Sequence, residues 1–170
     1  MAATKGNTAP GVKVLNSQGT KVYVLDVPAT AWTDCTTSAG AIIAGKLVGC
    51  PQSLGALSQT RSVTEYKCLS SNESAKALGG ISRGNLEIGL LLDPDDKAGQ
   101  KALVDAFASN TDVIFGIELP NKPATTGKNG TIYWFKAGVS AISTEVAMDA
   151  AITLTVTLEI SSDINECPAA

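Results

Sequence analysis

Histidine is absent from this 170-residue chain. Its absence excludes Ser-His-Asp triads, Cys-His pairs and histidine metal sites. Charged residues make up only 17% and aromatic residues 5%, whereas apolar residues make up 44%, which is too apolar for a disordered chain. No apolar run approaches the roughly 20 residues that span a bilayer, and the N-terminal stretch has no apolar core of a secretory signal. We therefore expect a soluble, single-domain protein that is made in the cytosol.

The four cysteines are too widely spaced for a typical zinc site. They stand at Cys35, Cys50, Cys68 and Cys167, without any CxxC pair, so we expect no zinc. Disulfides are conceivable in a particle that later leaves the cell, whereas synthesis in the cytosol favours free thiols. Cys68 lies in a strand-like run and is predicted to be a small buried hydrophobe.

The charges are distributed unevenly along the chain. The net charge is −3, but residues 1–83 carry net +4 and residues 84–170 carry net −7. No basic cluster appears, which argues against a tight nucleic-acid binder. The asymmetry suits a subunit whose positive surface meets the negative surface of a second copy, although an ordinary solvated surface explains it as well.

Alternating apolar and polar residues predict six strands. The last of them has apolar residues at 152, 154, 156, 158 and 160 and threonines between them, which indicates one buried and one wet face. Pro28–Gly40 is turn-prone, Ala41–Val48 fits a strand or a short buried helix, and Pro120–Gly130 fits a polar hairpin loop. The predicted strands are Thr20–Asp26, Arg61–Leu69, Asn85–Leu92, Val113–Leu119, Thr131–Val139 and Ala151–Ile160.

One helix is predicted over Pro94–Ala108. Asp93 is a suitable N-cap, and Pro94 fits the first helical position. Asp95 and Asp96 complement the positive end of the helix dipole, which explains this acidic cluster better than a cation site does. The long segment Ser70–Gly84 is rich in Ser and Gly and is predicted to be a functional or mobile loop.

These elements predict a mainly β fold, an antiparallel β-sandwich or partly open barrel with one α-helix packed at the side. We divide the chain into a flexible arm (1–17), a β-domain (18–162) and a C-terminal tail (163–170). The glycines near residue 80 match no phosphate-binding loop, and Ser70 and Cys35 have no evident base. We expect a structural or interaction protein, not an enzyme, without cofactor or metal.

Two stretches carry a resemblance to a known family. They are NLEIGLLLDPDDKAGQKALVDAF (85–107), a strand leading into the aspartate-rich start of the helix, and YWFKAGVSAISTEVAMDAAITLTVTLEIS (133–161). With the strands before them, they resemble the tail tube proteins of long non-contractile-tailed bacteriophages (siphophages). The resemblance covers roughly residues 18–162.

The resemblance implies a virion protein that forms hexameric rings. In this family the inner strands of the ring join into one β-barrel, and the rings stack into a tube through which DNA passes without specific binding. The implied partners are further copies and the tape measure, tail terminator and distal tail proteins, with assembly in the host bacterial cytoplasm and no membrane. Alternatives are a terminator or type VI secretion tube protein on the same fold, or a stand-alone β-sandwich that binds carbohydrate or protein.

Three groups of residues are candidates for roles in such an assembly. Acidic and threonine side chains that interrupt or alternate with apolar strand residues are expected to face the lumen: Glu87, Glu118, Thr153, Thr155, Thr157 and Glu159. Residues of the predicted long loop are expected to contact the next ring: Ala75, Leu78, Ile81 and Arg83. Lysines of the arm and first strand are expected to reach an acidic segment of a neighbour: Lys5, Lys13 and Lys21.

Overall fold

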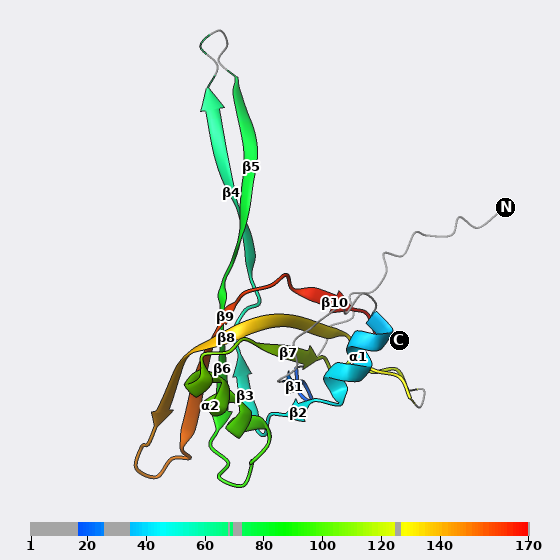
Figure 1. The fold of residues 1–170 in the computed structure, drawn as a ribbon, viewed down its shortest axis with the longest axis vertical. Coiled ribbons are helices and arrows are strands. Elements are labelled where there is room, and N and C mark those ends of the chain that lie inside the picture. Colours follow the sequence, from blue (N-terminus) through cyan, green and yellow to red (C-terminus); the bar gives the residue numbers. More distant parts are fainter. Residues whose placement is uncertain (1–16, 26–34, 68, 70–72, 125–126, 170) are drawn as a thin grey trace, which may run out of the picture.

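Ten strands and two helices make up the part of the chain that the computed structural model describes, which is residues 17–25, 35–67, 69, 73–124 and 127–169 (Figure 1). The strands are β1 (Lys21–Leu25), β2 (Lys46–Leu47), β3 (Pro51–Leu54), β4 (Gln59–Lys67), β5 (Ser74–Arg83), β6 (Asn85–Leu91), β7 (Val113–Glu118), β8 (Ile132–Glu145), β9 (Thr153–Ile160) and β10 (Asn165–Cys167). The helices are α1 (Cys35–Ile43) and α2 (Gly99–Ser109).

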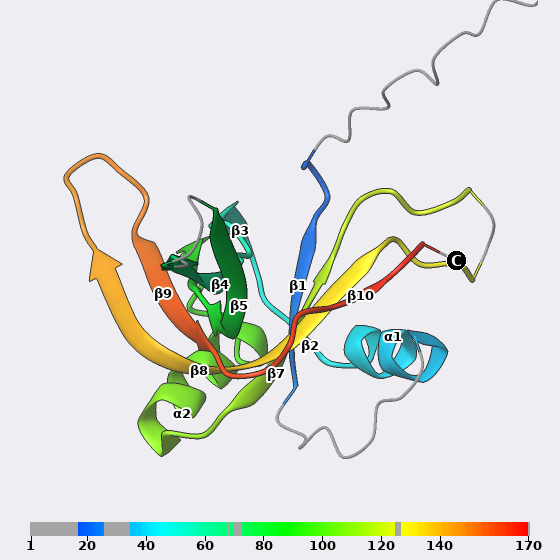
Figure 2. The same cartoon turned by 90° about the horizontal axis from the view of Figure 1, so that it is seen from above.

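Eight of the strands form one antiparallel sheet. Seven follow one another in the order β2-β1-β7-β8-β9-β6-β3, and β10 pairs with β8 outside this order. The long strand β8 joins the two halves of this sheet. Its first residues pair with β7 on one edge and with the short strand β10 on the other, and its later residues pair with β9. Seen from above, the sheet curls along β8 and remains open (Figure 2). The remaining two strands, β4 and β5, form a separate hairpin that projects from this body (Figure 1).

The curl of the sheet brings its two halves onto one main core. Val22 and Val24 of β1, Phe115 of β7 and Phe135 of β8 pack in the same cluster as the apolar residues of β6 and β9. Helix α2 contributes Ala102, Leu103 and Ala106 to this cluster. The predicted inward face of the last strand is confirmed for positions 154, 156, 158 and 160, which are buried, whereas Ile152 is exposed.

A second, smaller core lies on the opposite face of β1, β7 and the start of β8. Tyr23, Ile114 and Ile132 alternate with the main-core residues of their strands and pack with Ile42 of α1. Because both faces of β7 are covered, all six of its residues are buried. This double burial explains why Val113–Glu118 reads as a nearly continuous apolar run.

The fold class is confirmed as mainly antiparallel β with an open sheet, but the expectation of one helix was wrong. Helix α1 occupies part of Pro28–Gly40, which was predicted to be turn-prone, and part of Ala41–Val48. Its sequence, CTTSAGAII, has little helical preference of its own. The helix forms where the fully buried Ile42 packs on the sheet, so tertiary packing outweighs local propensity.

The prediction of a loop over Ser70–Gly84 was also wrong, because Ser74–Arg83 forms β5. This strand pairs with β4 in antiparallel register from Lys67↔Ser74 to Gln59↔Arg83, with one irregularity. The Gly and Ser residues that suggested a loop fit a close approach of the two strands: a Cβ at Gly79 would collide with the Ser62 hydroxyl. Small residues in a strand can thus mark tight cross-strand packing.

The six predicted strands are found as β1, β4, β6, β7, β8 and β9, and β8 is longer than predicted. Strand β8 continues six residues beyond the predicted end at Val139 and reaches Glu145, across an irregularity between Val139 and Ala141. In the predicted C-terminal tail, Asn165–Cys167 forms β10. The loop at 120–130 connects β7 and β8 as expected. Cys68 lies outside the described residues.

The start of α2 differs from the prediction. The helix begins at Gly99, not at Pro94, and Asp93 is not its N-cap. Asp96 takes the capping role: its carboxylate accepts hydrogen bonds from the backbone N–H groups of Ala98, Gly99 and Gln100. It also accepts one from Gly49 N–H at 2.9 Å, which ties the β2–β3 connection to the helix. Burial raises the pKa of Asp96, but these four backbone hydrogen bonds outweigh burial and leave the pKa lowered.

Replacement of Asp96 is expected to destabilise the subunit. The D96A variant loses the cap and leaves the Gly49 N–H without its acceptor, so we expect a loss of about 1–3 kcal/mol in the free energy of unfolding. Because the folded-state pKa is lowered, this stabilisation is fully present above the unfolded pKa of about 4 and is lost progressively as the pH falls from there through the lower folded-state pKa. Urea unfolding at pH 7 and pH 3 measures both effects. The matched control is D95A at the exposed neighbouring position; an equal loss in both variants would contradict the prediction.

Candidate assembly surfaces

One face of the sheet is polar and is covered by neither helix. It belongs to β3, β6, β9 and the later part of β8, and its rows follow from the register: Glu145 faces Thr153, Ser143 faces Thr155, and Glu87 faces Thr157. Helix α1 packs on β1, β7 and β10, while the buried residues of α2 belong to the main core. We call this surface the polar sheet face. Its four strand segments contain glutamates but no lysine or arginine, so the face is acidic.

Five of the six residues proposed for the lumen lie together on the polar sheet face. Asn85 faces Glu159 in the neighbouring row, and both side chains are exposed. The three threonines are partly exposed, and Glu87 is exposed. These five are Glu87, Thr153, Thr155, Thr157 and Glu159.

Glu118 lies apart from the other five, because it ends β7 and is only 7% exposed. The Tyr23 hydroxyl donates to its Oε2 at 3.1 Å, and the Gly130 N–H donates to its Oε1 at 3.3 Å. Lys21 Nζ lies 3.9 Å from Oε2. Burial, followed by the hydrogen bond and the negative charge of Glu118, raises the pKa of Tyr23 to about 12. The contacts of Glu118 therefore hold the β7–β8 loop against β1.

The β4–β5 hairpin, which we call the arm, is exposed along its length. All nine residues of β4 and nine of the ten in β5 are exposed. Val63 and Leu78 face each other across the two strands and are 56% and 68% exposed, and Tyr66 is 59% exposed. An isolated two-stranded hairpin is marginally stable in water, and exposed apolar side chains on it mark an interaction surface.

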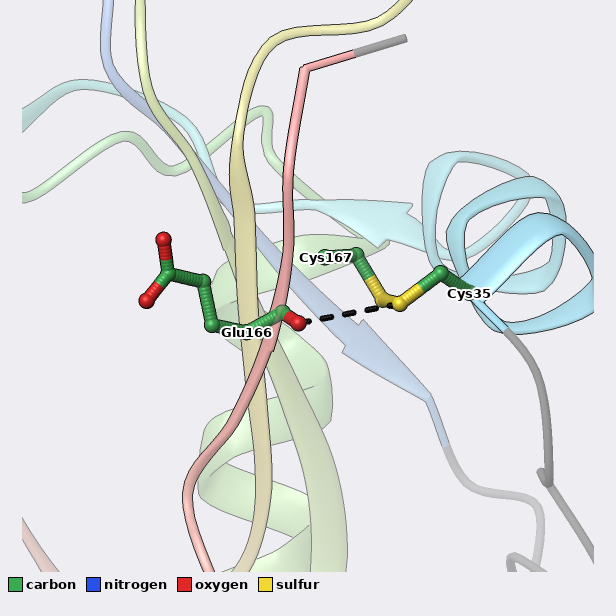
Figure 3. The surroundings of a disulfide bond; sticks show 3 residues. All are labelled: Cys35, Glu166 and Cys167. Carbon is green, nitrogen blue, oxygen red and sulfur yellow. Dashed lines mark hydrogen bonds between the residues drawn. A yellow bond between two sulfur atoms is a disulfide. The ribbon is translucent and has the colours of Figure 1, made fainter.

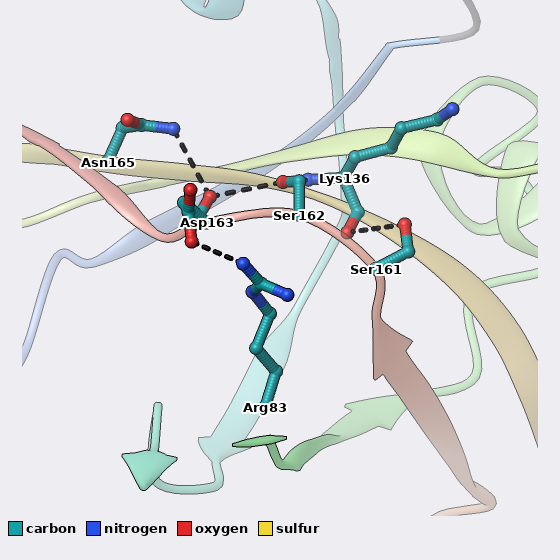
Figure 4. A network of polar contacts seen from close by, with 6 residues as sticks. All are labelled: Arg83, Lys136, Ser161, Ser162, Asp163 and Asn165. Carbon is teal, nitrogen blue, oxygen red and sulfur yellow. Dashed lines mark hydrogen bonds and ion pairs between the residues drawn. The ribbon is translucent and has the colours of Figure 1, made fainter. Parts of the chain in front are cut away.

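The proposed stacking residues all lie on this arm. Ala75, Leu78 and Ile81 lie along β5 and are exposed, and Arg83 ends the strand at the base. Arg83 forms an ion pair with Asp163 in the connection between β9 and β10 (Figure 4). That connection is itself held in place: the Lys136 N–H donates to the Ser162 hydroxyl, and the Asn165 amide donates to the Asp163 carbonyl oxygen. The network fixes the base of the arm on the body.

Strand β8 has a free edge over residues 138–145. These residues pair with β9 on one side, while β7 pairs only as far as Ala137 on the other. No other strand among the described residues pairs with this edge. Sequence reasoning missed the edge because the predicted strand ended at Val139. An unpaired edge of this length offers its N–H and C=O groups to another strand.

A hollow of about 590 Å³ lies at the base of the arm. The apolar part of its lining comes from β3, β7, β8 and the connections next to them, and includes Leu54, Leu57, Ile117, Leu119 and Tyr133. This hollow is the feature that a stand-alone ligand-binding domain could use. Of the two tryptophans, Trp134 packs against the smaller core and Trp32 lies outside the described residues.

Among the described residues, no group of three or more Cys, Asp or Glu side chains could hold a metal ion, and no helix is long and apolar enough to cross a membrane. The aspartates near α2 serve backbone hydrogen bonds: Asp93 Oδ1 accepts from the Asp95 N–H at 3.0 Å. Three lysines near the N-terminus, Lys5, Lys13 and Lys21, were proposed to reach a neighbouring copy. Lys21 lies at the start of β1, whereas Lys5 and Lys13 lie outside the described residues.

Comparisons with known proteins find similarity in structure alone. No family model matches the chain, and no curated protein matches it in sequence. A chain of the anti-feeding prophage (AFP) baseplate superposes with a TM-score of 0.65 at 12% identity, over 95% of this chain and 97% of that one. A chain of the AFP tube-terminating cap gives 0.65 at 14% identity, over 99% and 100%. The SPP1 tail tube gives 0.63 at 14% identity, over 90% and 78%. The chain thus has the fold of proteins from phage tails and contractile injection systems.

Proposed function

We propose that this chain is a structural subunit of a phage-tail-like tube, in which hexameric rings of the subunit stack on one another. The observation that carries the proposal is the similarity of fold over nearly the whole chain to the SPP1 tail tube and to AFP components. Three features of the single subunit support it, because each is incomplete alone: the polar sheet face, the free edge of β8, and the arm.

The free edge of β8 supports lateral association. Residues 138–145 present one row of unpaired backbone groups, and β3 at the far end of the sheet presents another. If an edge of one copy pairs with an edge of the next, the sheet continues between copies, and a ring that closes leaves no edge free. In this proposal the polar sheet face becomes the wall of the lumen.

The composition of the polar sheet face supports a role as a conduit. Glu87, Glu159 and Glu145 are exposed on it, without a basic residue in the same strand segments. An acidic wall repels DNA phosphates, so DNA passes without binding tightly. The proposal extends to a siphophage-type virion tail that is assembled in the host bacterial cytoplasm. Its partners are the tape measure, terminator and distal tail proteins, and it needs no catalytic activity or cofactor.

Electron microscopy and light scattering of the purified full chain test the proposal. We expect hexameric rings or stacked tubes in negative stain, with a mass that is a multiple of six subunits by size-exclusion chromatography with light scattering. A chain that stays monomeric over a hundredfold range of concentration would contradict the proposal. The stand-alone ligand-binding domain would then be the remaining alternative.

A terminator on the same fold is the second candidate. The matches to the AFP cap and to the PVC sheath/tube terminator, with a TM-score of 0.63 at 13% identity, favour it. The same micrographs distinguish the two roles, because a terminator forms single rings that do not stack, whereas a tube subunit polymerises with increasing concentration.

Charge reversal on the polar sheet face is expected to make the tube retain DNA. In E87K each subunit of the ring carries a lysine in place of this glutamate. Tubes of the variant should therefore bind a short fluorescent oligonucleotide at low salt and release it as the salt concentration rises. Cosedimentation at 50 and 300 mM NaCl measures retention. The matched control is D95K, at an exposed position outside this face. Equal retention by E87K and D95K tubes would show that Glu87 does not line the lumen.

A further inference from the structure

A disulfide joins the start of α1 to the end of β10. It links Cys35, the first residue of α1, to Cys167, the last residue of β10, across 132 residues of sequence, with a Cα–Cα distance of 5.2 Å (Figure 3). Sequence reasoning left the cysteine pairing open, because the two residues share no short spacing. The tertiary fold brings them together by placing α1 and β10 side by side.

Apart from the disulfide, β10 is held by its pairing with β8 and by a side-chain hydrogen bond between Tyr133 and Glu166. The strand has three residues, and it pairs only with Ile132–Trp134 at the start of β8. Of its side chains, Cys167 alone is buried, at 3% exposure, next to Ile132 and Ile42 in the smaller core. A three-residue strand near the end of a chain frays readily, so the covalent link to α1 is the strongest restraint on it.

The disulfide is open to small thiols. Cys35 is exposed, and both cysteines line a hollow of about 260 Å³ together with residues 127–130 of the β7–β8 loop. Thiol–disulfide exchange needs such access to one of the two sulfur atoms. Cys35 Sγ also lies 3.6 Å from the Glu166 carbonyl oxygen, to which a reduced Cys35 thiol could donate a weak hydrogen bond (Figure 3).

We propose that Cys35 and Cys167 form a redox-controlled latch on the C-terminal strand. In a reducing compartment the two thiols are free, and β10 detaches from β8 by local opening. In an oxidising environment a disulfide such as oxidised glutathione accepts the two electrons. The two thiols lose their protons, the Cys35–Cys167 bond forms, and two molecules of reduced glutathione are released.

Opening of the latch changes two surfaces of the subunit. It frees the edge of β8 at Ile132–Trp134, and it removes Ile164 and Glu166 from the rim of the hollow at the base of the arm. It also disturbs the connection that carries Asp163, the partner of Arg83. The latch is a property of the single subunit and does not depend on the proposed function.

Hydrogen exchange of the purified chain in its two redox states tests the latch. The parent for all samples is C50S/C68S, which leaves Cys35 and Cys167 as the only thiols. With oxidised glutathione we expect a mass loss of 2 Da and slow exchange of the peptide covering 163–169. With dithiothreitol we expect at least about tenfold faster exchange in that peptide, reversed on reoxidation.

Two comparisons make the outcome decisive. The C35S variant of the parent should exchange like the reduced parent in either buffer, and residues 85–91 of β6 should be equally protected in all samples. Failure of the parent to lose 2 Da, or equal exchange at 163–169 in both redox states, would overturn the latch. Faster exchange in β6 upon reduction would also overturn it, because the disulfide would then stabilise the whole fold and not β10.

Discussion

A subunit without the arm is expected to fold but not to form tubes. The arm can be removed cleanly, because its base is already closed by a hydrogen bond from the Gly84 N–H to the Ser58 carbonyl oxygen at 3.2 Å. Joining Ser58 to Gly84 through a short Gly-Asn turn removes residues 59–83 and leaves both cores intact. We expect an unchanged Tm, within a few degrees, and rings in negative stain in place of stacked tubes.

Point variants on the arm test whether its apolar side chains carry the contact. Burial of Leu78 and Ile81 against a neighbouring copy contributes about 1.5–3 kcal/mol each. The double variant L78S/I81S should therefore raise the concentration needed for tubes by a hundredfold or more. The control is V104S, a similar loss of an exposed apolar side chain on α2. Long tubes from the arm-deleted or L78S/I81S protein at the wild-type concentration would contradict the role of the arm in stacking.

Proline on the free edge of β8 is expected to leave the protein monomeric. Successive amides in a strand point to opposite edges, so of S143P and T144P one removes an N–H that faces β9 and the other an N–H on the free edge. Both positions are exposed. We expect the variant with the amide on the free edge to keep most of its stability and lose ring formation altogether, because proline blocks strand pairing between copies.

Circular dichroism and sedimentation velocity separate the two proline variants. The variant with the lower Tm identifies the amide that pairs with β9, and the other one tests the edge. If that stable variant still forms rings as readily as the wild type, the edge of β8 is not the contact between neighbouring copies, and the far edge at β3 becomes the alternative.

The resemblance based on 85–107 and 133–161 pointed to the correct fold even where details within these stretches were wrong. The alternation in β6 and β9 was correct because both strands bury one face and expose the other, which leaves a period of two in the sequence. Helix α2 was predicted from the residues at its start, Asp93 to Asp96, but that start was misplaced by five residues. Its aspartates at 93, 95 and 96 are all plausible caps, and only the structure shows that Asp96 accepts the hydrogen bonds of the first helical N–H groups and of Gly49.

The sequence by itself determined the mainly antiparallel β architecture, the absence of histidine chemistry and the wet threonine face of β9, because each of these follows from residue types or from their period along one strand. Only the tertiary structure decided the rest. Helix α1, the pairing of Cys35 with Cys167, the burial of Glu118 and the free edge of β8 all depend on contacts between segments that lie far apart in the chain. The local sequence carries no record of such contacts, since a helix of low propensity or an isolated cysteine acquires its role from the partner that the fold brings to it.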